Sequence, residues 1–173
     1  FIELNPQLAQ ASLERIEDFA RQNNWQTQLN GMHLVIKSPH NIIEIEVVND
    51  SFLKLGEIVN LSEVDLVTAA AVFDLLSLGM LEEFMQLLLD TKVALLATIN
   101  YAGMRFLPEE VADIYYADLY GKHMKREQAF GISLGPDCSR EMMNFYHRKN
   151  RPIVCGPSNW KVKPTDVNMY SFL

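Results

Sequence analysis

The stretch that decides the fold spans residues 61–100 and reads LSEVDLVTAAAVFDLLSLGMLEEFMQLLLDTKVALLATIN. Ser62 and Asp65 have the spacing of a capping box, in which two side chains satisfy free backbone N–H groups at a helix start. Apolar residues then recur at helical spacing, and Gly79, which disfavours a helix interior, divides the pattern in two. The periodic residues are Leu66, Ala69, Ala70, Phe73, Leu76, Met80, Leu81, Phe84, Met85 and Leu88. The stretch therefore predicts a central pair of apolar helices.

The residues before this stretch predict one helix followed by strands. Apolar positions gather on one face over Leu8–Asn23, as in an amphipathic helix. His33–Lys37 alternates in polarity, and further along Glu44 and Glu46 alternate with three apolar residues, as in a strand with one exposed, acidic face. With a further piece at Ser51–Leu55, these segments predict an antiparallel meander. We expect the central helix pair to cover its apolar face.

The residues after this stretch predict a hairpin and a helical C-terminal region. Val93–Ile99 is typical of a strand, and Gly103–Leu107 is its expected hairpin partner. Pro108 opens a long helix at its preferred first position, with acidic residues in the first turns and basic residues near the end. A short strand at Phe130–Leu134 and a helix at Cys138–Lys149 follow. The predicted fold class is therefore α+β.

Charge divides the chain into an acidic and a basic part. The net charge is −7 over 173 residues, but residues 1–120 carry 6 Lys or Arg against 18 Asp or Glu. Residues 121–173 carry 9 against 4. We therefore predict an acidic α+β core over 1–120 and a basic, aromatic-containing region over 121–173 that packs on the same domain. An acidic total disfavours nucleic acid as a partner, because long-range repulsion opposes a local basic patch.

The apolar central stretch does not predict a membrane span. Charged residues interrupt it, so that no run of about 18 uncharged apolar residues remains. These residues are Asp74, Glu82, Glu83, Asp90 and Lys92. The first residues hold no basic region followed by an apolar run, as a secretory signal would. Two Cys and eight Met are typical of a reducing compartment, so we expect a cytoplasmic location.

The catalytic hypotheses centre on the two cysteines. Cys138 and His147 lie nine residues apart on one expected helix, which places them on opposite faces and about 13 Å apart along the axis. Cys155 is the remaining nucleophile, and His123 or His147 would be its base across space. This is the enzyme alternative, a cysteine-dependent hydrolase or transferase. Otherwise both cysteines are small buried hydrophobes.

The sequence predicts no metal and no cofactor. Zinc sites contain a close pair of ligands such as C-x₂₋₄-C or H-x₃₋₅-H, and neither spacing occurs here. Phosphate-binding loops of the G-x-x-x-x-G-K-[ST] and G-x-G-x-x-G types are also missing from the sequence. The paired carboxylates are explained by a solvent-exposed strand face and by a helix start.

Two groups of residues are candidate binding surfaces besides Glu44 and Glu46. Cations alternate with aromatic residues in the C-terminal region, a combination that suits phosphates and stacked bases but also an acidic protein surface. These residues are Arg140, Phe145, Tyr146, Arg148, Lys149, Arg151, Trp160, Lys161, Lys163 and Tyr170. The second group, Tyr115, Tyr116 and Tyr120, forms an aromatic stripe of the kind enriched at protein interfaces, and packing in a core with the hydroxyl groups at its edge is the alternative.

We therefore predict a non-enzymatic protein-interaction module with an adaptor, chaperone-like or regulatory role. Its expected partner is another protein or a second copy, since the acidic part of the chain itself suits the basic region. Nucleic-acid binding through the basic region is the other alternative. Over residues 1–107 the expected order of helix, strands, helices and strands resembles that of secretion-type chaperones, which are small acidic binders of other proteins.

Overall fold

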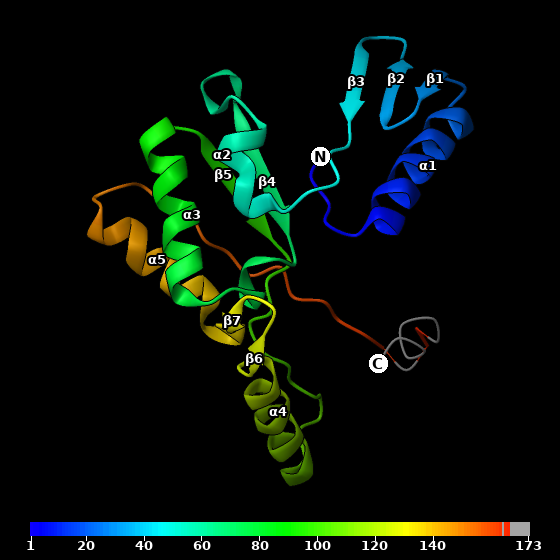
Figure 1. The fold of residues 1–173 in the computed structure, drawn as a ribbon. Helices are drawn as coiled ribbons and strands as arrows, with labels where there is room; N and C mark the ends of the chain where they lie inside the picture. The colour runs from blue at the N-terminus through cyan, green and yellow to red at the C-terminus, as the bar shows by residue number, and fades with distance from the viewer. Residues whose placement is uncertain (164, 167–173) are drawn as a thin grey trace. The chain divides into compact units, whose positions relative to one another are not determined.

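The computed structural model describes residues 1–163 and 165–166 and has the predicted α+β class. The chain divides into two compact units, Phe1–Glu63 and Val64–Leu173, and each is described by itself. Figure 1 shows the elements of both units along the chain. None of the described helices is long and apolar enough to cross a membrane.

The first unit contains a long N-terminal helix, a three-stranded antiparallel sheet and a short helical segment after the sheet (Figure 1). Helix α1 spans Pro6–Gln22, close to the predicted bounds, because the Asn5 side chain caps its first backbone N–H groups. The sheet order is β1 (Gln26–Asn30), β2 (His33–Lys37) and β3 (Ile42–Glu46). The predicted meander is thus confirmed over β2 and β3, while β1 is an additional strand.

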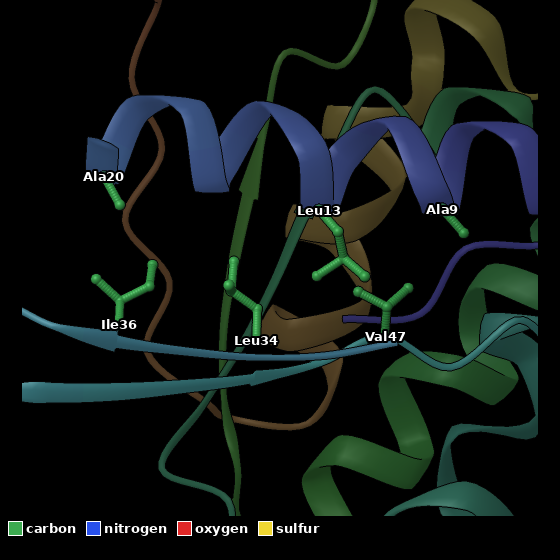
Figure 2. Close-up of a cluster of buried hydrophobic side chains, with 6 residues drawn as sticks. All are labelled: Ala9, Leu13, Ala20, Leu34, Ile36 and Val47. Carbon is green, nitrogen blue, oxygen red and sulfur yellow. The ribbon is translucent and has the colours of Figure 1, made fainter. Parts of the chain in front are cut away.

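The core of this unit lies between α1 and the sheet (Figure 2). Leu13 projects from the helix toward Leu34 and Val47, and all three are buried. The whole cluster is Ala9, Leu13, Ala20, Leu34, Ile36 and Val47. The prediction that the central helices cover the meander is therefore wrong. Helix α1 carries an apolar face of its own, and it is adjacent in sequence to the strands that it covers.

The segment after the sheet is helical rather than extended. Short turns occupy η1 (Phe52–Lys54), α2 (Leu55–Ile58) and η2 (Leu61–Glu63), so the predicted extended piece at Ser51–Leu55 is wrong. The physical reason is local, because the Ser51 hydroxyl accepts a hydrogen bond from the Leu53 N–H at 3.3 Å. Such a cap starts a helical turn.

The second unit begins with a strand, a helix and a second strand. β4 (Leu66–Ala70) and β5 (Ala94–Thr98) pair in parallel, and α3 (Leu78–Thr91) connects them. The predicted helix pair is therefore wrong in its first half. Short apolar runs satisfy helix and strand patterns alike, and parallel pairing with β5 decides for the strand. The capping box predicted at Ser62 and Asp65 therefore starts no helix, because β4 follows it. Ser77 caps α3, and its hydroxyl accepts a hydrogen bond from the Met80 N–H at 3.5 Å.

The predicted hairpin after the central stretch is also wrong. Residues 103–107 form no strand, because the expected partner strand β5 pairs with β4 instead. A two-residue antiparallel pair occurs later, between β6 (Glu127–Gln128) and β7 (Gly131–Ile132). The predicted short strand at Phe130–Leu134 is thus present in part.

Two further helices complete the second unit. α4 spans Val111–Met124 and α5 spans Cys138–Arg148, both within a few residues of their predicted bounds. The turns η3 (Phe73–Leu75) and η4 (Gly135–Asp137) contact α5, which also packs on α3. The buried apolar residues come from η3, α3 and α5 and the residues beside them: Phe73, Leu76, Leu81, Phe84, Met85, Leu88, Cys138, Met142 and Phe145.

Candidate functional site

Helix α4 has large apolar side chains that remain exposed. None of its 14 residues is buried. Six large apolar side chains are between 42% and 87% exposed: Val111, Ile114, Tyr115, Tyr116, Leu119 and Tyr120. A helix with apolar residues around its whole circumference is ordinarily covered on all sides. An exposed patch of this kind marks an interaction site in a soluble protein.

The ends of α4 explain how the helix is held. At its start the Asp113 carboxylate accepts a hydrogen bond from the Glu110 N–H at 2.9 Å. At its end Met124 lies against the backbone at Gly135, where an added Cβ would come within 3.2 Å of the Met124 Cβ. Lys125 forms an ion pair with Asp137 of η4. The C-terminal end is therefore anchored, and in Figure 1 the rest of α4 extends away from α3 and α5.

A shallow hollow of about 390 Å³ opens beside the helix. It is lined by Met104, Tyr116, Leu119, Tyr120, His123 and Arg126. The ring of Tyr120 contacts Tyr101 edge-on at 5.4 Å and lies 6.3 Å from the His123 ring. An apolar and aromatic wall with a cation at one end suits an amphipathic side chain or helix.

All three tyrosines of the predicted stripe are exposed on α4. Tyr115 and Tyr116 contact each other edge-on at 5.8 Å between ring centroids. Sequence reasoning missed Val111, Ile114 and Leu119, because their helical spacing is also that of residues facing a core. Only the tertiary structure shows that no core is present there.

The second notable place is the carboxyl end of the two parallel strands, where α/β sheets commonly hold their ligands. Ala71 and Ile99 follow β4 and β5 with φ of 54° and 58°, a strained conformation for residues other than glycine. Just beyond them, Asp74 Oδ1, Asn100 Oδ1 and Tyr101 Oη are buried and have no hydrogen-bond partner among residues 1–163 and 165–166. Sequence analysis missed this cluster because it placed Asp74 within a helix.

Burial raises the pKa of the Asp74 carboxyl above its ordinary value of 3.8, although backbone N–H groups of Asp74 and Tyr101 favour the charged form. Burial likewise raises the pKa of the Tyr101 hydroxyl. The cluster therefore combines strained backbone with polar groups whose neutral forms are favoured.

The two cysteines occupy different surroundings. Cys138 is fully buried, and burial, together with the Asp74 carboxylate, raises the pKa of its thiol to about 12. A thiol of this kind is a poor nucleophile near neutral pH. Cys155 is exposed, and among the described residues no hydrogen bond joins it to His123 or His147. Within the same residues no group of three or more His, Cys, Asp or Glu side chains could hold a metal ion.

The acidic strand face is present as predicted. Glu44 and Glu46 are exposed on β3, opposite Val35 and His33 of β2. The Glu44 carboxylate lies 4.0 Å from His33 Nε2. The face thus carries two solvent-exposed carboxylates on the first unit.

The basic C-terminal residues are neutralised in part by carboxylates of the same unit. Arg148 pairs with Glu82 of α3. Arg140 contacts Asp137 at 2.8 Å and Glu141 at 3.1 Å.

Other residues of this region remain open to solvent. The Lys149 ammonium lies 5.5 Å from the centre of the Phe145 ring, while Arg151 and Trp160 are exposed. Tyr170, which we also predicted to belong to this group, lies outside the described residues.

Comparison of the chain with family models, with curated proteins and with solved structures gave no match. The resemblance in expected element order to secretion-type chaperones therefore has no matching structure behind it.

Proposed function

We propose that this chain is a non-enzymatic protein-interaction module, adaptor, chaperone-like or regulatory in role, which binds its partner through α4. The observation that carries the proposal is the helix without a buried residue, whose six large apolar side chains are 42–87% exposed. Covering such residues releases the free energy of apolar burial, about 25 cal/mol for each Å². The three tyrosines are of the type that interfaces favour.

The electrostatic features give secondary support. The acidic face at Glu44 and Glu46 offers a further contact surface on the first unit. Arg151 and Trp160 offer one in the C-terminal region. Charged groups in a contact surface direct association and specificity more than they add affinity.

The alternatives rest on fewer observations. Nucleic-acid binding requires free cations, but Arg140 and Arg148 already pair with carboxylates. A cysteine-dependent enzyme requires a base beside Cys155. In the described part of the chain no hydrogen bond joins Cys155 to a histidine. The interaction module is thus the proposal that the exposed surfaces favour.

Affinity capture with the full chain tests the proposal. Wild type is compared with a Tyr115→Ser/Leu119→Ser variant, which makes α4 polar without touching a buried residue. We expect partners that wild type retains from its source extract to be lost, by at least about tenfold in amount, with this variant.

The matched control is Ile42→Ser, because Ile42 is 66% exposed but lies on β3. This variant should retain the same partners as wild type. An identical set of partners for the wild type and the α4 variant would contradict the proposal. Circular dichroism of all three proteins excludes a loss of folding as the cause.

A further inference from the structure

The partner that α4 suits best by its own charge distribution is a second copy of α4. Acidic residues lie at the start of the helix: Glu109, Glu110 and Asp113. Basic residues lie at its end: Lys122, Lys125 and Arg126. Two such helices in antiparallel orientation bring each acidic end beside the basic end of the other copy. Their macrodipoles are opposed, which is also favourable.

The charges within one copy do not cancel this polarity. Arg105 lies 3.7 Å from Glu109, and Asp118 lies 2.6 Å from Lys122, so each end is offset only in part. Glu110 and Arg126 form no ion pair in the described part of the chain. These two residues are therefore available for ion pairs with a second copy.

The apolar residues between the two charged ends complete the surface. Val111, Tyr115 and Leu119 follow one another at intervals of four residues, so they form one stripe along the helix. They are 87%, 63% and 46% exposed. A stripe that meets itself across a two-fold axis forms an isologous interface, the commonest type in homodimers.

We propose that two copies of this chain associate through an antiparallel pair of α4 helices, with the apolar stripe at the centre and the charged ends in register. This inference rests on the proposed function, since it names the partner of the same surface. A helix of 14 residues is about 21 Å long. An interface of this size is smaller than the standard one of about 800 Å² on each partner, so the pair should be weak and reversible.

Sedimentation equilibrium of the full chain, over roughly three decades of concentration from about 1 µM, measures this association. The first variant, Glu109→Lys/Glu110→Gln, makes both ends of α4 basic, and the glutamine keeps an acceptor oxygen for the Asp113 N–H that the Glu110 side chain caps. The second, Lys122→Glu/Arg126→Glu, makes both ends acidic. Asp113 and Lys125 are left unchanged, because they cap α4 and pair with Asp137.

We expect the wild type to form a dimer, and each variant alone to dissociate at least about tenfold more readily because like charges meet. An equimolar mixture of the two variants should restore the dimer, since each acidic end again meets a basic end. The control Glu44→Lys/Glu46→Gln makes the same change in net charge on β3 as the first α4 variant makes on α4, and it should dimerise as the wild type does.

Three results would overturn the inference. The first is a wild type that stays monomeric throughout, and the second is a dimer that neither α4 variant weakens. The third is a mixture that fails to restore association, although circular dichroism shows both variants to be folded. The proposed function is judged separately: a monomeric chain whose captured partners still depend on Tyr115 and Leu119 would keep the interaction module while rejecting the homodimer.

Discussion

Asp74 connects a single buried carboxyl with the pH dependence of stability. Burial raises its pKa above 3.8 in the folded protein, whereas the unfolded chain keeps the ordinary value. Between these two pKa values the folded state holds a proton that the unfolded state has lost. The stabilising contribution is therefore complete below about pH 3.8 and is lost as the pH rises through the folded-state pKa.

We expect Asp74→Asn to remove this titration. As the pH rises, the wild type loses stability when Asp74 ionises, and the variant does not. The free energy of unfolding of the variant minus that of the wild type should therefore increase by about 1.4 kcal/mol for each unit by which the folded-state pKa of Asp74 exceeds its unfolded-state pKa. Urea unfolding of both proteins at about pH 4 and about pH 7 measures the gain. A difference between the two proteins that is the same at both pH values would contradict this assignment.

The two thiols should differ sharply in reactivity. Cys155 is exposed, while Cys138 is fully buried with a pKa of about 12. Thiolate content and access set the rate of alkylation, so we expect one thiol to react with iodoacetamide in the native protein and the second only after unfolding. Peptide mass spectrometry identifies the modified residue. Rapid alkylation of Cys138 in the native protein would contradict its burial at the start of α5.

Among the elements, α1 offers the clearest comparison of buried and exposed residues. Leu13 is fully buried against the sheet, whereas Leu8 of the same helix is 56% exposed (Figure 2 shows Leu13). We expect Leu13→Ala to lower the free energy of unfolding by about 3 kcal/mol, because it leaves a cavity in the core. Leu8→Ala should cost less than about 0.5 kcal/mol. Chemical denaturation of the two variants checks the difference, and equal losses would place the core elsewhere.

The elements themselves show which patterns a sequence reports well. α1, β2 and α5 were predicted within a few residues, because each has a single periodicity with a cap or turn at its ends. β4 was mistaken for a helix, since a run of Leu, Val, Thr and Ala over five residues fits either pattern. Pairing with β5, residues 94–98, cannot be read locally.

For the whole molecule, the division into two units predicts how the chain unfolds. Leu13 belongs to the buried cluster of the first unit, and Leu81 is fully buried in the second. We expect two unfolding transitions in urea, with Leu13→Ala shifting one and Leu81→Ala shifting the other. Two-state behaviour is the rule for one cooperative domain. A single transition that both variants shift equally would show that the units unfold together.

The charge division of the whole chain is a property that the sequence alone determined. The acidic excess of residues 1–120 and the basic excess of residues 121–173 follow from counting, and the structure shows carboxylates of the chain pairing with Arg140 and Arg148. The α+β class was also predicted correctly, because it depends on residue type and local periodicity. These features need no knowledge of distant contacts.

The tertiary structure alone decided what each apolar face meets. In the tertiary structure α1 covers the meander, β4 pairs with β5 in parallel, and no residue of α4 is buried. The tertiary structure also placed the Asp74 carboxyl within hydrogen-bond reach of the Tyr101 backbone N–H, just beyond the ends of β4 and β5. The physical reason is that apolar burial has no direction: the sequence specifies which residues avoid water, but only the long-range arrangement of the elements specifies their neighbours.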